Sequence, residues 1–223
     1  ARELFRNIDY ILWRYRGYNP VRQLREISPE RLQQLAADGR VLALYDSVMA
    51  AFDAEMSAKD TWFGSNYPDL LKGPMAYFSM EFAIHSSLPI YAGGLGILAG
   101  DMCKEASDLG LPFVGIGFMY PQGYFHQRIS ASGAQEEVYQ QLDFDEVPIQ
   151  PVLAGDGKRL LVKVPLGDST ISVAVWKVGV GRGNVYLLDT GVPENELHER
   201  QLSARLYVAD PEIRLQQEIV LGM

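Results

Sequence analysis

The sequence has little cysteine, no long apolar run and no excess of positive charge. Its one cysteine, Cys103, cannot form an internal disulfide, so no oxidising compartment is required. No apolar run reaches the length that crosses a bilayer, and the basic, aromatic start is not typical of a signal peptide. The net charge of −8 argues against nucleic acid and anionic membranes as partners, because both need a basic face. We therefore expect a cytoplasmic protein.

Histidines are also few, and their positions are scattered. His85, His126 and His198 have no spacing typical of a metal site, so no metal is expected. With 48% hydrophobic and 11% aromatic residues, the composition is that of a globular chain with a sizeable core. Its 223 residues suit one large domain, or a domain with an appendage.

An apolar segment and a following helical pattern dominate the middle of the chain. Residues 75–82 are short, aromatic and apolar, which predicts a buried strand. Residues 83–92 would form a connecting loop. Residues 97–109 carry apolar side chains at helical spacing. Gly110 and Pro112 then follow at positions typical of a helix end.

The loop that opens this helix has the sequence Gly93-Gly94-Leu95-Gly96. Glycine lets a backbone approach a ligand closely, and first-turn N–H groups have no partner within a helix. The helix dipole favours negative charge at the same place. The N–H groups of Gly94, Leu95 and Gly96 are therefore predicted to hold a phosphate or a sugar hydroxyl. The alternative is a tight turn whose glycines serve only close packing, and the pattern alone does not decide between the two.

The first part of the chain has sequence patterns typical of helices. Apolar residues at helical spacing occur over 2–18, and an apolar stripe follows over 41–56. Between them, Ser28 is a good N-cap residue with proline after it. We therefore divide the chain into a helical N-terminal extension, residues 1–65, and an α/β domain, residues 66–223.

The second half of the chain predicts strands and one further helix. Residues 113–119 predict a strand parallel to the first, and Gly115 and Gly117 within it predict close approach of another backbone or a ligand. Residues 211–221 predict a helix with Asp210 as its N-cap. Further strands of a meander or mixed sheet are predicted at residues 159–165, 170–178 and 184–189.

Longer motifs in the chain resemble those of one known family. They are YFSMEF at residues 77–82, GGLG at 93–96, ASDLGL at 106–111, GFMYPQGYFHQR at 117–128 and the stretch 205–218. They resemble the N-terminal region of the α-glucan phosphorylases, the glycogen, starch and maltodextrin phosphorylase family. Residues 87–91 and 98–101 look most like its short bacterial and archaeal branch, and residues 2–20 look like the extra N-terminal piece of that branch.

This resemblance implies a fold and a reaction. The fold would be the Rossmann-like N-terminal domain of a GT-B glycosyltransferase, in which two such domains face each other across a cleft. The reaction would be phosphorolysis, which removes the terminal glucose of an α-1,4-glucan with inorganic phosphate and gives glucose 1-phosphate. Partners would be the glucan, phosphate, the C-terminal domain of the same polypeptide and, in an oligomer, further copies of the chain. Allosteric control is left open.

The resemblance also implies a cofactor that this chain does not attach. Pyridoxal phosphate is bound in the family to a lysine of the C-terminal domain, which is expected beyond Met223, so no lysine here is assigned to it. Family members are several times longer than 223 residues. We therefore expect a fragment that has no turnover alone.

Candidate site residues follow from the same motifs. Gly93, Gly94, Leu95 and Gly96 would be the loop that meets phosphate and the glucosyl unit. Glu81 matches a strand-end acid near the catalytic cleft and is the catalytic candidate. Its alternative role is that of a structural carboxylate that accepts hydrogen bonds from backbone N–H groups of the following loop.

Three further positions are candidates on weaker matches. His85 lies just before the glycine loop and is a candidate for substrate or phosphate binding. Asp210 and Arg214 match a mobile gate near the acceptor site. The chain departs from larger phosphorylases at Ile97, where those carry a basic residue, and at Ala83, where those carry an aromatic one.

Two other functions remain as alternatives. A glycogen or starch synthase-like glycosyltransferase shares the glycine loop and the GT-B fold, but uses a nucleotide sugar and no pyridoxal phosphate. A non-catalytic module that binds a sugar or phosphate is the alternative from another class. The segments 120–128 and 206–218 favour the phosphorylase.

Overall fold

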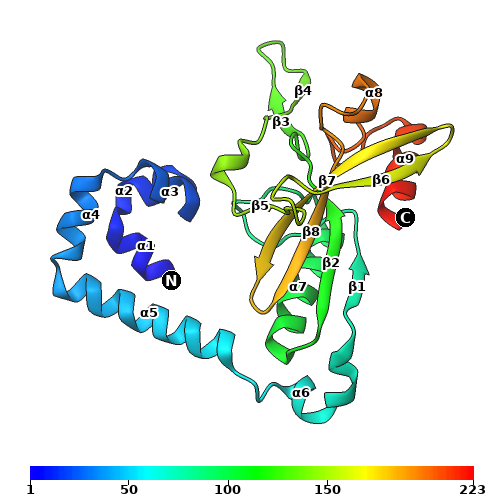
Figure 1. Ribbon diagram of the computed structural model, residues 1–223. Coiled ribbons are helices and arrows are strands. Elements are labelled where there is room, and N and C mark those ends of the chain that lie inside the picture. Colours follow the sequence, from blue (N-terminus) through cyan, green and yellow to red (C-terminus); the bar gives the residue numbers. More distant parts are fainter.

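The computed structural model describes residues 1–223 and has a helical part beside an α/β part (Figure 1). The helices of the first part are α1 (Arg2–Ile8), α2 (Tyr10–Tyr15), α3 (Pro20–Glu26), α4 (Pro29–Ala36) and α5 (Gly39–Ser57). Helix α6 (Trp62–Asn66) follows at the foot of the α/β part. The helices predicted at Ser28 and over residues 41–56 are confirmed as α4 and α5. No helix combines the length and the apolar character that crossing a membrane requires.

Side-chain caps set where these short helices begin. Asp9 has extended backbone and accepts from the Leu12 N–H (2.9 Å), so the pattern over residues 2–18 forms two helices. Ser28 Oγ accepts from the Arg31 N–H at 3.1 Å, as expected of an N-cap. The long helix α5 buries none of its residues. Together with α1 and α4 it lines an apolar groove of about 760 Å³.

Asn19 joins the helical part to the α/β part. Its Oδ1 accepts from the N–H groups of Val21 (2.9 Å) and Arg22 (3.2 Å), which caps α3. Its Nδ2 donates to the carbonyl oxygen of Glu146 at 2.9 Å, 127 residues away. Arg22 also pairs with the Glu146 carboxylate. One buried side chain therefore starts a helix and holds that helix against the neighbouring part.

Replacing Asn19 with alanine is expected to loosen α3. The change removes an N-cap and leaves the partly buried Glu146 carbonyl without its donor, which together cost about 2 kcal/mol, or roughly 30-fold in an opening equilibrium. Hydrogen exchange of the α3 amides measures this directly. Asn7→Ala is the matched control, because the Asn7 side chain bonds only within α1 at an exposed position. Equal exchange in the two variants would contradict the prediction.

The second part is built on a mixed sheet. It has the order β1-β2-β8-β7-β5, with β6 also paired to β7. The strands are β1 (Met75–Phe78), β2 (Phe113–Phe118), β5 (Gln150–Pro151), β6 (Leu161–Leu166), β7 (Ser169–Val180) and β8 (Gly183–Asp189). Strands β1, β2 and β8 are parallel, whereas β7 is antiparallel to β5, β6 and β8. The parallel first pair and the three later strands are thus confirmed.

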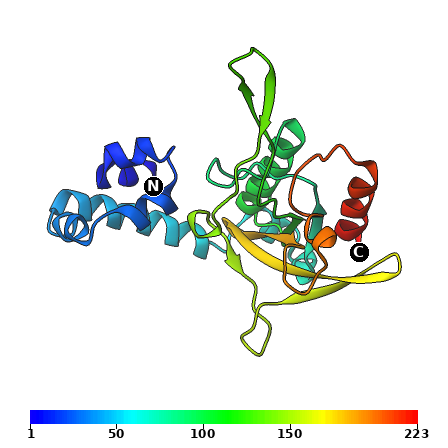
Figure 2. The same cartoon turned by 90° about the horizontal axis from the view of Figure 1, so that it is seen from above.

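The remaining elements surround this sheet. They are α7 (Gly94–Leu109), α8 (Leu197–Arg200), α9 (Pro211–Gly222), the 3-10 helices at Pro68–Lys72 and Phe144–Glu146, and a separate hairpin of β3 (His126–Ile129) and β4 (Gln135–Val138). Helix α7 packs on β2, β7 and β8, and α9 packs on β2 and β6. Figure 2 shows the hairpin extending away from the body of the domain. The architecture is α/β.

The first strand is shorter than predicted, and the prediction that it is buried is wrong, because Met75, Ala76 and Phe78 are exposed. It ends at Phe78 instead of Phe82, because the chain turns at Ser79, whose hydroxyl donates to the Glu81 carbonyl at 2.9 Å. The ring of Phe82 then lies over β2. A Cβ added at Gly115 or Gly117 would lie 3.2 Å or 2.8 Å from that ring. The backbone carbonyl oxygen of Ser79 also lies 2.8 Å from the Cβ position of Gly117, so the predicted close approach of another backbone is confirmed there. At Gly115 the close neighbours are side chains, those of Val185 (2.9 Å) and Phe82.

The main core lies between the sheet and the helices that cover it. Its fully buried side chains include Phe82, Leu88, Ile90, Phe118, Met119, Tyr120, Ile171, Val173, Leu187 and Leu206. The single thiol, Cys103, is buried there on α7, and burial raises its pKa to about 11. It is therefore a packed residue of the core.

Candidate functional site

The site lies at the edge of the sheet where the three parallel strands end. Glu81 follows β1, Tyr120 follows β2, and Asp189 ends β8. Helix α7 follows β1 and connects it to the parallel strand β2, so the N-terminus of α7 lies at this same edge. In open α/β sheets, ligands bind outside the carboxyl ends of the strands. The glycine motif is thus at the edge where a ligand is expected.

The predicted glycine loop is the first turn of α7. The helix begins at Gly94 instead of Ile97, with Gly93 as its N-cap, and it ends at Gly110 with φ +75°. The N–H groups of Gly94, Leu95 and Gly96 have no hydrogen-bond acceptor in the protein. Gly94 and Leu95 are exposed. Three unpaired donors therefore begin the helix. Those of Gly94 and Leu95 belong to exposed residues, whereas Gly96 is buried.

Glu81 occupies the two amides that precede these donors. The carboxylate is only 2% exposed. Its Oε2 accepts from the N–H groups of Ala92 (2.6 Å) and Gly93 (3.2 Å). Its Oε1 accepts from the hydroxyl of Tyr207 at 2.6 Å. Both oxygens are thus bound within the protein, which is the structural role that was the alternative to catalysis for this residue.

Two glycines of α7 are required by close packing. A Cβ at Gly96 would lie 2.7 Å from Tyr91 Cβ and 2.8 Å from Glu81 Oε2. A Cβ at Gly100 would lie 2.2 Å from the carbonyl oxygen of Ala83. The Ala83 N–H in turn donates to the Gly96 carbonyl at 2.9 Å. The segment after β1 is therefore bonded directly to the first turn of the helix.

Two other glycines of the motif have free space instead. Nothing lies within 4 Å of a Cβ built on Gly93 or Gly94. Both residues are exposed, and neither has positive φ. Packing therefore explains Gly96, and it leaves the open half of the motif, Gly93 and Gly94, available for close approach of a ligand.

Comparison with known proteins identifies the family. A family model described as "Protein of unknown function (DUF3417)" matches residues 1–88. Over 100% of its length, the chain is 44% identical to maltodextrin phosphorylase of Thermococcus litoralis and spans 27% of that protein. The chain belongs to the α-glucan phosphorylase family. It is also 43% and 40% identical to the glycogen phosphorylases of Aquifex aeolicus and Mycobacterium tuberculosis, of which it spans 31% and 26%.

The family resemblance seen in the motifs is thus confirmed over the whole chain. The match falls on the N-terminal portion of these phosphorylases, and the chain spans less than a third of each relative's length. The glycine motif, Glu81 and Tyr207 all lie within the matched length. The roles of the individual site residues stay predictions.

His85 lies apart from the glycine motif. Its Nδ1 is 2.8 Å from Ser87 Oγ and 3.1 Å from the Ser87 backbone nitrogen. The side chain lines a cavity of about 460 Å³ together with Trp13 and Tyr18 of the helical part. No hydrogen bond joins it to residues 93–96. The geometry thus gives His85 local bonds and no direct link to the unpaired amides.

Asp210 and Arg214 both belong to the start of α9. Asp210 Oδ1 accepts from the N–H groups of Glu212 (2.9 Å) and Ile213 (3.4 Å), which confirms it as the N-cap. Arg214 is exposed one turn further on. Its positive charge opposes the rise in the pKa of the Tyr207 phenol that burial and Glu81 cause. The gate role of this pair stays a prediction.

Tyr207 is the residue of this site that sequence reasoning missed. It reaches Glu81 across 126 residues of chain, so no local pattern connects the two. Its φ of +57° is uncommon for a residue other than glycine. Only the match of residues 205–218 to the phosphorylase pattern pointed at its segment, and that match carried no role for the phenol.

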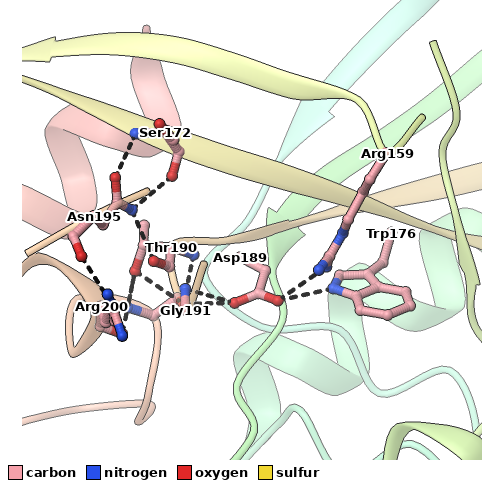
Figure 3. A network of polar contacts seen from close by, with 9 residues as sticks. Arg159, Ser172, Trp176, Asp189, Thr190, Gly191, Asn195 and Arg200 are labelled. Atoms are coloured by element: carbon pink, nitrogen blue, oxygen red, sulfur yellow. Dashed lines mark hydrogen bonds and ion pairs between the residues drawn. The ribbon is translucent and has the colours of Figure 1, made fainter. Parts of the chain in front are cut away.

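Asp189, at the end of β8, anchors a polar network next to the site (Figure 3). Its Oδ2 accepts from Trp176 Nε1 (3.0 Å) and Arg159 Nη2 (3.2 Å), and its Oδ1 accepts from the Gly191 N–H (2.8 Å). The carboxylate is 4% exposed. Asn195 bonds to the backbone of Ser172 on β7: its Oδ1 accepts from the Ser172 N–H, and its Nδ2 donates to the Ser172 carbonyl (2.7 Å each). The network holds the segment after β8 in place.

Alkaline pH is expected to weaken the fold through two phenols. Burial, together with the hydrogen bond to Glu81 and its negative charge, raises the pKa of Tyr207 to about 12, with Tyr124 adding to the rise and Arg214 opposing it. Burial also raises the pKa of Tyr120, which donates to the Met80 carbonyl at 2.8 Å. Both phenols are bound protonated. Their stabilisation is therefore complete below the ordinary value of 10.0 and is lost as pH rises through the raised values.

The thermal midpoint measured against pH tests this. We expect the midpoint to fall between pH 10 and 12, and to fall less steeply in Tyr207→Phe, which has no phenol to ionise there. Tyr10→Phe, at a position 50% exposed, is the control. Parallel curves for wild type and Tyr207→Phe over this range would contradict the assignment.

Proposed function

We propose that residues 1–223 form the N-terminal part of an α-1,4-glucan phosphorylase, the first Rossmann-like lobe of a GT-B glycosyltransferase. The reaction transfers the terminal glucose of a glycogen or maltodextrin chain to inorganic phosphate and gives glucose 1-phosphate. The single observation that carries the proposal is the set of unpaired N–H groups at Gly94, Leu95 and Gly96. The named phosphorylases among the relatives and the parallel β1-α7-β2 unit support it.

In this proposal the chain's own residues bind and orient an anion. Unpaired amides at a helix N-terminus favour negative oxygens, and they act at no reorganisation cost because the backbone holds them. An oxygen of phosphate or of glucose 1-phosphate would accept from one or more of these amides. Glu81 keeps the preceding turn in place with Ala92 and Gly93. The pairing of both of its oxygens favours a positioning role over a catalytic one.

An anion at the glycine motif needs a positive charge that the motif itself does not supply. The Glu81 carboxylate already lies at the helix start, and Ile97 is neutral where larger phosphorylases carry a basic residue. A second anion beside a carboxylate is opposed unless a positive charge is near. We propose that this charge, and the lysine that holds pyridoxal phosphate, belong to residues outside 1–223. When bound, that cofactor supplies a phosphate group for proton transfer to the substrate phosphate.

An assay of the full-length protein tests the proposal. Maltodextrin with inorganic phosphate should release glucose 1-phosphate, and the protein should show the absorbance of bound pyridoxal phosphate. Residues 1–223 alone should show no turnover. Glucosyl transfer from a nucleotide sugar without phosphate dependence would favour the synthase-like alternative. Binding of maltodextrin or phosphate with no reaction of either kind would favour the non-catalytic module.

A further inference from the structure

We propose that Tyr207 is a positioning residue that acts through Glu81 on the first turn of α7. This inference rests on the proposed function, because it names how the anion site is held. The Tyr207 hydroxyl donates to Glu81 Oε1 at 2.6 Å, and Glu81 Oε2 accepts from the Ala92 and Gly93 N–H groups. One buried carboxylate thus connects the segment before α9 to the turn that presents the unpaired amides.

The carboxylate needs the phenol to keep its orientation. Glu81 is 2% exposed, so water cannot replace a lost donor freely. A buried acceptor without its donor carries a desolvation cost, and the group moves to reduce that cost. Without the phenol, we expect the carboxylate to rotate out of its present orientation. The N–H groups of Ala92 and Gly93 would follow it.

Movement of the carboxylate is passed to the open amides by direct contact. Glu81 Oε2 lies 2.8 Å from the Cβ position of Gly96, so the carboxylate packs against the backbone of the first turn. The Gly96 carbonyl also accepts from the Ala83 N–H, two residues after Glu81. The first turn therefore cannot keep its place if the carboxylate shifts. The donors of Gly94 to Gly96 would then lose their alignment.

The segment that carries Tyr207 is rigid enough to act as an anchor. Leu206 is 1% exposed, and its N–H donates to the Gly123 carbonyl at 3.0 Å. Buried Gln217 donates from α9 to the carbonyl of Arg205 at 3.1 Å. The ring of Tyr124 meets the Tyr207 ring edge-on at 6.3 Å. Such surroundings maintain the positive φ of Tyr207, a backbone state that persists only where neighbours hold it.

The effect should fall on phosphate more than on glucan. Tyr207 has no part in binding the sugar chain in this scheme, and it acts only on the amides that receive an anion. In the full-length enzyme, Tyr207→Phe is expected to raise the KM for phosphate about tenfold, the size expected when one hydrogen bond to a charged group is lost. The KM for maltodextrin should change less than about twofold.

Tyr124→Phe is the matched control. It removes the same hydroxyl from the ring that packs against Tyr207, and the Tyr124 hydroxyl donates to no carboxylate. Its KM for phosphate should equal that of wild type. The two changes Tyr207→Phe and Glu81→Gln should also be strongly non-additive, because one acts through the other. Equal phosphate KM values in Tyr207→Phe and Tyr124→Phe, or additive effects in the double variant, would overturn the proposal.

Hydrogen exchange of residues 90–97 gives a readout without activity. In Tyr207→Phe the amides of Ala92 and Gly93 should exchange about tenfold faster than in wild type or Tyr124→Phe. Unchanged exchange would overturn the inference even if the enzyme is an active phosphorylase. Faster exchange with an unchanged KM for phosphate would reduce Tyr207 to a structural residue and overturn it too. A wild-type enzyme without phosphorolysis would overturn the proposed function. The exchange data would still decide whether Tyr207 acts through Glu81 on the first turn of α7.

Discussion

Replacing Gly94 with alanine is expected to leave the fold intact and to lower phosphorolysis by the full-length enzyme about 100-fold. The new methyl group would keep the anion away from the amides, which has the same effect as losing an oxyanion donor. A Cβ at this position meets nothing within 4 Å, and the backbone has no positive φ. The unfolded chain loses freedom with alanine, so stability should rise by about 0.4–1 kcal/mol. The methyl group would instead stand on the open side of the motif, where the anion is proposed to approach.

A matched substitution separates the two effects. Gly39 is the first residue of α5, as Gly94 is of α7, and a Cβ there also meets nothing within 4 Å. Gly39→Ala should therefore match Gly94→Ala in thermal midpoint and match wild type in phosphorolysis. If Gly94→Ala is as active as Gly39→Ala, the open half of the motif does not face the substrate.

Gly100→Ala is expected to have the opposite profile, with a large loss of stability. The new Cβ would lie 2.2 Å from the Ala83 carbonyl oxygen and 2.7 Å from its carbon. These are backbone atoms, so neither can rotate away, and the helix and the segment after β1 must separate. Overpacking of this kind costs about 3 kcal/mol or more. The thermal midpoint of the full-length protein and the yield of soluble protein both report it.

The control for this change lies in the same helix. Gly94→Ala alters the same residue type in α7 at a position with free space, so helix propensity alone cannot explain a difference between the two. A Gly100→Ala protein with the stability of wild type would mean that α7 and the Ala83 carbonyl are not in contact.

Local chemistry explains which parts of the fold could be predicted. Ser28 and Asp210 cap helices, and Gly110 ends one, because each role depends only on residues within a turn of it. The end of β1 could not be predicted. Residues 75–82 are apolar except for Ser79 and Glu81, and the pattern does not distinguish a strand residue from Phe82, whose ring lies against two glycines of β2.

In the candidate site, too, contacts between residues near in sequence could be predicted and contacts between distant residues could not. The unpaired amides were predictable, because glycine motif and helix start are adjacent in sequence. Glu81 bonds to the following loop, which was the alternative role considered for it. Its third partner was not predictable, because Tyr207 is 126 residues away and a phenol donor leaves no pattern in sequence. His85, near the motif in sequence, bonds to Ser87 and faces the helical part.

A crystal structure of the full-length protein with glucose 1-phosphate bound tests the central claim most directly. A phosphate oxygen should lie within about 3.2 Å of the backbone nitrogen of Gly94, Leu95 or Gly96, with Glu81 still bound to Ala92 and Gly93. A ligand bound elsewhere, with the first turn of α7 left facing water, would contradict it.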